Sequence, residues 1–249
     1  MLVSARSTDG AGFLRARRPE QKEQRAAAIL EAARDLALRD GVGAVSLAAI
    51  AARVGVHKSA LLKYFGTREE IFLRLSETEW LTWADTVVTA LSAVPGSHAG
   101  DGVAEVLGRS VAERPLFCQL LMHSSLTLER NVSLDALRRS KVAAMGSTDA
   151  VADAVHRLLP DLPREACFEL VAATGLVAAG LWQAAHPPPV VVTLYAEQGN
   201  AGRFARLTRM DLSAEVTRFA RVFLAGLRSE PAAPHVGAVL RGSGCAAPE

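Results

Sequence analysis

Side chains that donate hydrogen bonds are concentrated in residues 57–63. The segment is expected to be a short helix whose apolar residues pack inward. Periodicity places His57, Lys58, Ser59 and Lys63 on its outward side. Lysine donates to phosphate oxygens and to guanine O6 and N7, and a serine hydroxyl can reach either kind of acceptor. The chemistry that this segment predicts is the recognition of double-stranded DNA.

Patterns typical of catalysis or metal binding are absent from the sequence. It has no P-loop, GxSxG, HExxH or paired-carboxylate pattern, and its six histidines are dispersed. Cys118 and His123 do not share a helical face and have no partner pair nearby, which disfavours a metal site. We therefore expect no enzyme, metal or cofactor, and a helical enzyme is the remote alternative.

The donors lie in a helix-turn-helix pattern over residues 46–65. Ser46 is placed to cap a first short helix, Ala51 is small enough for two helices to touch, and Gly55 can adopt the left-handed turn between them. A second short helix is expected over 57–65. The Ser46 hydroxyl has two possible roles, a structural cap and a phosphate contact.

The neighbouring elements are also predicted to be helical. Apolar residues at intervals of three and four indicate a helix from Gln21 that ends at Gly41. Thr67 and Glu70 form a capping box, which opens a long helix to about Val94.

The run from Ile29 to Leu75, with the segments ILEAARDLALRDG, VSLAAIAARVGVHKSALLKYF and GTREEIFLRL, resembles the N-terminal domain of the TetR family of transcriptional regulators. This resemblance implies that the second short helix enters the major groove and that Tyr64 and Arg68 contact phosphates. Tyr64 has a structural alternative as a half-buried ring. The sequence departs from the family pattern at His57, Ala60 and Leu62, which puts the operator sequence in doubt.

The composition predicts an all-α fold, and the resemblance implies a three-helix DNA-binding head linked by a long helix to a larger helical domain for ligand binding and dimerisation. Alanine is abundant and aromatic residues make up only 5% of the chain, which suits helices better than strands. Further helices are expected at about 101–112, 115–129, 133–158, 163–185 and 211–228, whereas the strand-like Val190–Leu194 is too short and isolated to be a sheet.

Parts of the C-terminal sequence, at 113–133 and 180–187, resemble one subgroup of TetR C-terminal domains more weakly. The resemblance implies a homodimer in which helices 163–185 and 211–228 of two copies form a four-helix bundle. It also places the ligand pocket at Trp83, Phe117, Met122, His123 and Trp182. The alternative is that these five side chains fill the core.

Charge divides the chain into two parts. Residues 1–75 hold 13 Lys and Arg against 8 Asp and Glu, a net charge of +5, and the remainder holds 15 against 18, a net charge of −3. A basic head suits a polyanion. The expected domains are a flexible basic arm (1–20), the DNA-binding domain (21–66), the regulatory and dimerisation domain (67–228) and a flexible tail (229–249).

These patterns together predict a homodimeric repressor that a small-molecule effector releases from a double-stranded DNA operator. An activator, or a regulator that responds to a protein, is the alternative with the same architecture. We expect a cytoplasmic protein with no membrane association, because no apolar run of about 18 residues lacks a charge and no signal-peptide pattern is present.

Overall fold

The computed structural model of the chain describes residues 10–197 and 210–229. All regular structure in these two ranges is helical, which confirms the predicted all-α class. The first nine residues of the expected arm, the expected loop at 199–202 and the tail after Ser229 lie outside the described residues.

The head consists of the helices at the N-terminal end of the chain, which pack on the second half of α1. Its core is formed by apolar side chains from all of these elements, including Ile29, Ala33, Ile50 and Leu61, each no more than 1% exposed. The elements are α1 (Gly10–Asp40), a 3-10 turn (Val42–Ala44), α2 (Leu47–Val54) and α3 (Lys58–Leu61).

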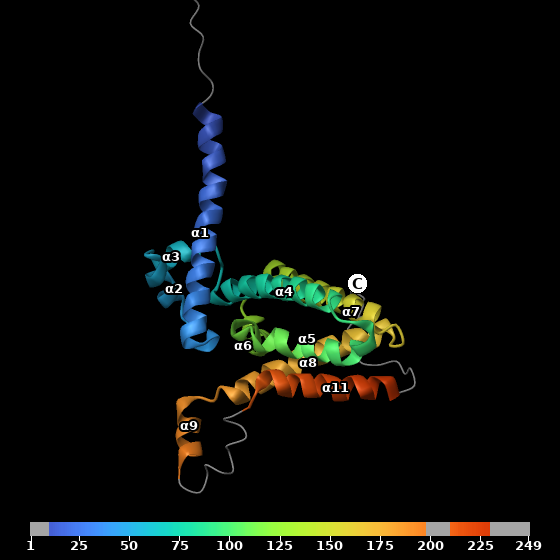
Figure 1. Cartoon of the computed structure of the whole chain (residues 1–249). Coiled ribbons are helices and arrows are strands. Elements are labelled where there is room, and N and C mark those ends of the chain that lie inside the picture. The colour runs from blue at the N-terminus through green and yellow to red at the C-terminus, as the bar shows by residue number, and fades with distance from the viewer. Residues whose placement is uncertain (1–9, 198–209, 230–249) are drawn as a thin grey trace, which may run out of the picture.

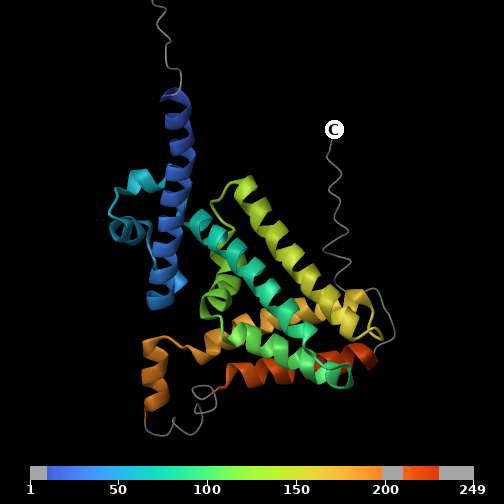
Figure 2. The same cartoon turned by 45° about the horizontal axis from the view of Figure 1, so that its top comes forward.

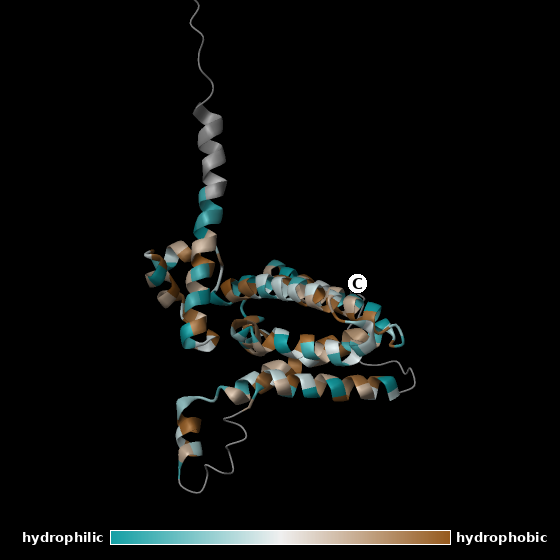
Figure 3. Ribbon diagram, in the orientation of Figure 1, coloured by the Kyte–Doolittle hydropathy of each residue, from teal (hydrophilic) through white to brown (hydrophobic). Residues whose placement is uncertain are grey.

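The helix α1 begins at Gly10, not at Gln21, so the second half of the segment expected to be a flexible arm is helical. Apart from Pro19, which has no amide hydrogen to donate, most residues between Gly12 and Gly41 favour helix, and no glycine interrupts them. The first half of α1 projects beyond α2 and α3 (Figure 1). Figure 3 shows hydrophilic residues on the described part of this projection and hydrophobic residues where the head packs.

The body is a bundle in which α4 and α7 lie beside each other, α5 packs on α4, α8 packs on α7, and α11 packs on α5 and α8 (Figures 1 and 2). Its apolar core includes Trp83, Val103, Phe117 and Val155, each at most 3% exposed. The body elements are α4 (Arg68–Ser92), a 3-10 turn (Gly96–His98), α5 (Ala99–Ala112), α6 (Pro115–His123), a π-helical turn (Ser124–Leu128), α7 (Leu134–Leu158), α8 (Arg164–Ala185), α9 (Pro189–Ala196) and α11 (Leu212–Ser229).

Three elements differ from the sequence prediction. The α-helical part of the second short helix covers only Lys58–Leu61, because tighter turn hydrogen bonds such as Tyr64 N to Leu61 O (2.9 Å) follow it. The helix expected over 115–129 changes to a π-helical turn after His123. The strand-like Val190–Leu194 lies in α9, which begins at Pro189 and projects from the body after a proline-rich bend.

Candidate nucleic-acid interface and effector cavity

The turn between α2 and α3 has the geometry that the sequence predicts. Ser46 caps α2 by accepting a hydrogen bond from the Ala49 amide at 3.1 Å. Gly55 ends α2 with φ +73°, a left-handed conformation that residues with a Cβ rarely adopt. Leu61, the last residue of α3, is fully buried in the head core. These contacts fix α3 on the head with its polar side outward.

The polar residues of α3 divide into a capping pair and two free cations. His57 is the N-cap, and its Nδ1 accepts a hydrogen bond from the Ser59 amide at 3.4 Å and lies 2.9 Å from the Ser59 hydroxyl. Lys58 and Lys63 are exposed, and within the described part of the chain neither forms an ion pair. Lys58 of α3 and Lys63 of the turn that follows it are therefore the side chains here that are most available to DNA.

Arg68, which was predicted to contact a phosphate, forms its hydrogen bonds within the protein. Its guanidinium donates to the carbonyl oxygens of Val42 and Val45 and to the Glu69 carboxylate, and it lies 4.7 Å from the centre of the Phe72 ring. The side chain is only 19% exposed. The structure thus gives Arg68 a role in joining α4 to the turn before α2, and its phosphate contact stays a prediction.

Tyr64 is half-buried against the head core, as its structural alternative predicts. Part of it also lines a surface groove with Lys22, Gln24 and Arg25 of α1. Sequence reasoning missed Lys22 and Arg25, although the basic side of α1 that contains them is visible as a repeat of three and four residues.

The head is fastened to the body by polar contacts at buried positions. Gln119 of α6 accepts a hydrogen bond from the Val42 amide through Oε1 at 2.7 Å. Glu79 of α4 is 4% exposed and pairs with Arg34 of α1 at 2.5 Å and with Arg114 at 3.6 Å. These contacts join α4 and α6 directly to α1 and to the turn before α2.

Glu70 makes a further link between the two parts. Thr67 accepts from the Glu70 amide at 3.2 Å, which confirms one half of the predicted capping box. The Glu70 carboxylate does not return to Thr67 but accepts from the amides of Gly66 at 3.0 Å and Ser133 at 2.8 Å. Burial acts to raise the pKa of Glu70, but hydrogen bonds from Ser133 and Gly66 and the charge of Arg139 outweigh it, so the pKa lies below its ordinary value.

The predicted ligand residues do not form one pocket. Trp83 and Phe117 are buried and stack at 5.5 Å between ring centres, with Trp80 edge-on to both. Trp182 stacks instead on His186, at 4.3 Å. Met122 and His123 are half-buried at the end of α6, where the His123 ring lies against Gly43 of the head.

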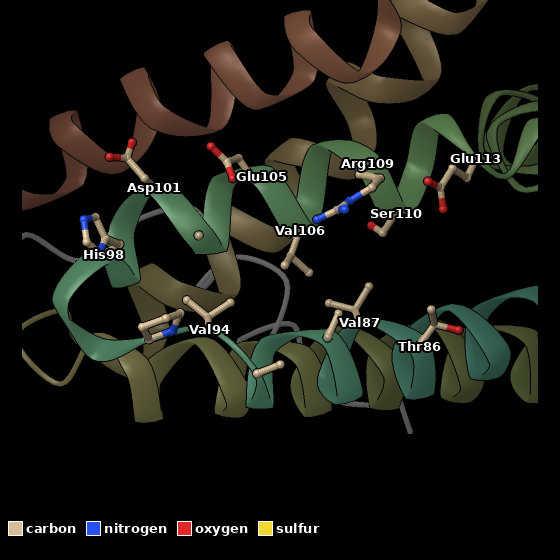
Figure 4. A pocket seen from close by; sticks show the side chains of 14 residues that line it. Thr86, Val87, Val94, His98, Asp101, Glu105, Val106, Arg109, Ser110 and Glu113 are labelled. Carbon is tan, nitrogen blue, oxygen red and sulfur yellow. The ribbon is translucent and has the colours of Figure 1, made fainter.

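A cavity of about 700 Å³ lies between α4 and α5, and none of the five predicted ligand residues lines it (Figure 4). Val87, Val94 and Val106 supply its apolar wall. At one end Val94, in the segment that follows α4, is in close contact with α5, because a Cβ on Gly102 would clash with the Val94 side chain. At the other end Trp83 Nε1 donates to Ser110 Oγ at 3.0 Å. The cavity is the opening between these two contacts.

Two comparisons identify the family. The family model described as "Bacterial regulatory proteins, tetR family" matches residues 29–75, and the model described as "Tetracyclin repressor-like, C-terminal domain" matches residues 77–231. The chain therefore belongs to the TetR family of DNA-binding transcriptional regulators, whose members are regulators and not enzymes.

A solved structure shares this fold. The fatty acid degradation regulator FadR from Bacillus halodurans is 14% identical, with a TM-score of 0.53 over 82% of this chain and 96% of its own. FadR from Thermus thermophilus, a repressor in complex with lauroyl-CoA, is 18% identical, with a TM-score of 0.48 over 84% of this chain and 98% of its own. Comparison with functionally curated proteins gives no match.

The helix α8 has the length and composition of a membrane span, with a mean hydropathy of 1.4 over its most apolar window. Core helices of soluble proteins pass the same test. In this structure α8 packs against α5, α6, α7 and α11.

Proposed function

We propose that this TetR-family regulator is a homodimeric repressor that binds its operator through α3 and leaves it when a small-molecule effector binds the body. The observation that carries the proposal is the position of α6. Its Leu116 and Leu120 belong to the head core, whereas Phe117 and Cys118 on the same helix belong to the body core. Packed cores shift between discrete arrangements, so a change in the body is transmitted to the head.

Lys58 of α3 and Lys63 of the turn that follows it are the proposed base or phosphate contacts. They are exposed and unpaired in the described chain, and they flank the residues that pack inward. Ser46, Ser59 and Tyr64 are proposed as secondary contacts. His57 serves in the first place as the helix cap.

A second copy of the chain is the proposed partner of α8 and α11. Leu176 of α8 and Val222 of α11 are 78% and 65% exposed, and Phe219 and Phe223 of α11 stack on each other while only half-buried. A Cβ on Gly180 would meet nothing within 4 Å, so this side of α8 admits close approach. Burying these side chains in a symmetric interface would place two α3 helices on one face of the DNA.

The effector is proposed to bind between α4 and α5, where the cavity can hold a drug-sized molecule. Ser110 lines the cavity and accepts a hydrogen bond from Trp83, which stacks on Phe117. A ligand that displaces Ser110 would therefore shift this pair of aromatic rings. An effector releases the operator only if it binds the DNA-free arrangement more tightly than the DNA-bound one.

The test is a gel shift on the DNA upstream of the gene, repeated with candidate effectors, for the wild type, K63A and the control R157A, whose arginine is exposed on the body. We expect K63A to lose affinity and R157A to match the wild type. An unchanged affinity and salt dependence of K63A would remove Lys63 from the interface. Transcripts of adjacent genes in a deletion strain test the sign of regulation: a rise indicates a repressor, and a fall indicates the alternative, an activator.

A further inference from the structure

A row of basic positions follows α1 out of the head. Arg15, Arg18, Lys22 and Arg25 are separated by three, four and three residues, so the helical repeat puts these positions on one face of α1. The same spacing continues to Ile29, which is 1% exposed in the head core. The face of α1 that binds the head therefore continues as a basic face beyond it.

The part of α1 that carries this basic face has no packing partner in the described chain. The described side chains from Gln21 to Arg25 are exposed, and the helix projects past α2 and α3 in both views (Figures 1 and 2). An isolated helix of this length is marginal in water, and like charges three or four residues apart destabilise it further. A polyanion along the basic face would remove that repulsion.

Unpaired cations of the described chain are concentrated on the head. Lys22, Arg25, Lys58 and Lys63 form no ion pair there, whereas most arginines of the body are paired, as Arg164 is with Asp149 and Asp153. Lys22 and Arg25 share their groove with Tyr64, which follows directly after Lys63. The basic face of α1 thus adjoins the proposed DNA-binding side of α3.

We propose that the basic face of α1, formed by Arg15, Arg18, Lys22 and Arg25, is a second DNA-binding surface that contacts the phosphate backbone outside the segment read by α3. Residues 10–28 would span roughly 28 Å at about 1.5 Å per residue, enough to follow the backbone for most of a helical turn of DNA. Contacts of this kind set affinity and position and carry no sequence information. The proposal rests on the proposed function of α3.

Because phosphate contacts are independent of sequence, a random 40-base-pair duplex is a sufficient probe. Binding is measured by fluorescence anisotropy across a salt series for the wild type, K22A/R25A, R15A/R18A and the conservative variant K22R/R25K. The control R138A/R157A removes the same charge from exposed positions of α7. Circular dichroism and the melting temperature confirm that every variant is folded.

We expect K22A/R25A to bind about ten- to thirtyfold more weakly at physiological salt, with the slope of log K against log salt reduced by about 0.9 for each phosphate that the variant no longer neutralises. R15A/R18A should show a similar loss, and K22R/R25K should bind like the wild type. The proposal is overturned if both alanine variants match R138A/R157A in slope and affinity. K63A in the same assay separates the two claims: if only K63A weakens binding, α3 is the DNA-binding element and α1 is not. If the wild type does not bind the random duplex, the proposed phosphate contacts of α1 are overturned, whereas the gel shift on the upstream DNA decides operator binding by α3 separately.

Discussion

The side chain of Gln119 in α6 holds the backbone of Val42, 77 positions earlier in the sequence, through a 2.7 Å hydrogen bond at a buried site. Val42 lies in the turn between α1 and α2 and is completely buried. The same turn is held from the other side by Arg68, which donates to the Val42 carbonyl. The peptide groups at the base of the helix-turn-helix are thus satisfied by residues from α4 and α6.

Replacing Gln119 with alanine should destabilise the protein by about 1–3 kcal/mol, because the buried Val42 amide loses its acceptor. Urea unfolding followed by circular dichroism measures the change. The control is Q24A, at an exposed glutamine of α1. Equal stabilities of Q119A and Q24A would show that water or another group satisfies the Val42 amide.

A glycine pair tests the packing of α5 on α11. A Cβ on Gly108 would clash with Thr217 Oγ1 and would lie 2.8 Å from Thr217 N and 2.9 Å from Ser213 O, and the last two atoms are backbone. G108A should therefore lose about 1–3 kcal/mol or more of unfolding free energy, because α11 must move away.

The matched substitution is G146A on α7, where a Cβ meets nothing within 4 Å. It should gain about 0.5–1 kcal/mol, because alanine favours the helix. Thermal unfolding of both variants gives opposite shifts if the packing is as described, and a neutral G108A would contradict the close contact between α5 and α11.

Local patterns in the sequence were sufficient to predict the helix-turn-helix frame, because caps, the glycine turn and apolar periodicity depend on neighbouring residues. The Ser46 cap, the left-handed Gly55 and the buried Leu61 all follow from such patterns. The contacts of Arg68 within the chain were not predicted, since two of its acceptors are carbonyls more than twenty residues away. No periodicity reveals a contact of that kind.

The ligand site was the least predictable part for the same reason. Trp83 and Phe117 were expected to line a pocket, but their positions say only that they face inward. The opening between α4 and α5 depends on two distant contacts, Val94 with Gly102 and Trp83 with Ser110. It is a property of how the helices pack and not of any one segment.

The two described cysteines should be unreactive in the folded protein. Cys118 and Cys167 are fully buried, and burial raises the pKa of the Cys118 thiol to about 12 and that of the Cys167 thiol to about 11. In a C245S variant, a thiol reagent at pH 8 should therefore modify less than about a tenth of the two thiols before denaturation and both after it. Rapid modification without denaturant would show that the body opens locally at α6 or α8.

Stability should depend on pH through His123, at the contact between α6 and the head. Burial and then the charge of Arg68 lower the pKa of His123 below its ordinary value of 6.5. In the unfolded chain it titrates near ~6.5. The unfolded state therefore binds the proton more readily, and the stability present above that pH is lost as the pH falls through the folded-state pKa.

H123Q removes this proton and keeps a neutral polar side chain, so its free energy of unfolding should fall less than that of the wild type between pH 7 and pH 5. Urea unfolding at several pH values measures the two slopes. H98Q is the control, since His98 is exposed at the far end of the body and its only side-chain hydrogen bond in the described chain is to Ser97. If H123Q and H98Q both show the pH dependence of the wild type, other groups cause the loss of stability at low pH. The pKa of His123 is then not lowered by burial and Arg68.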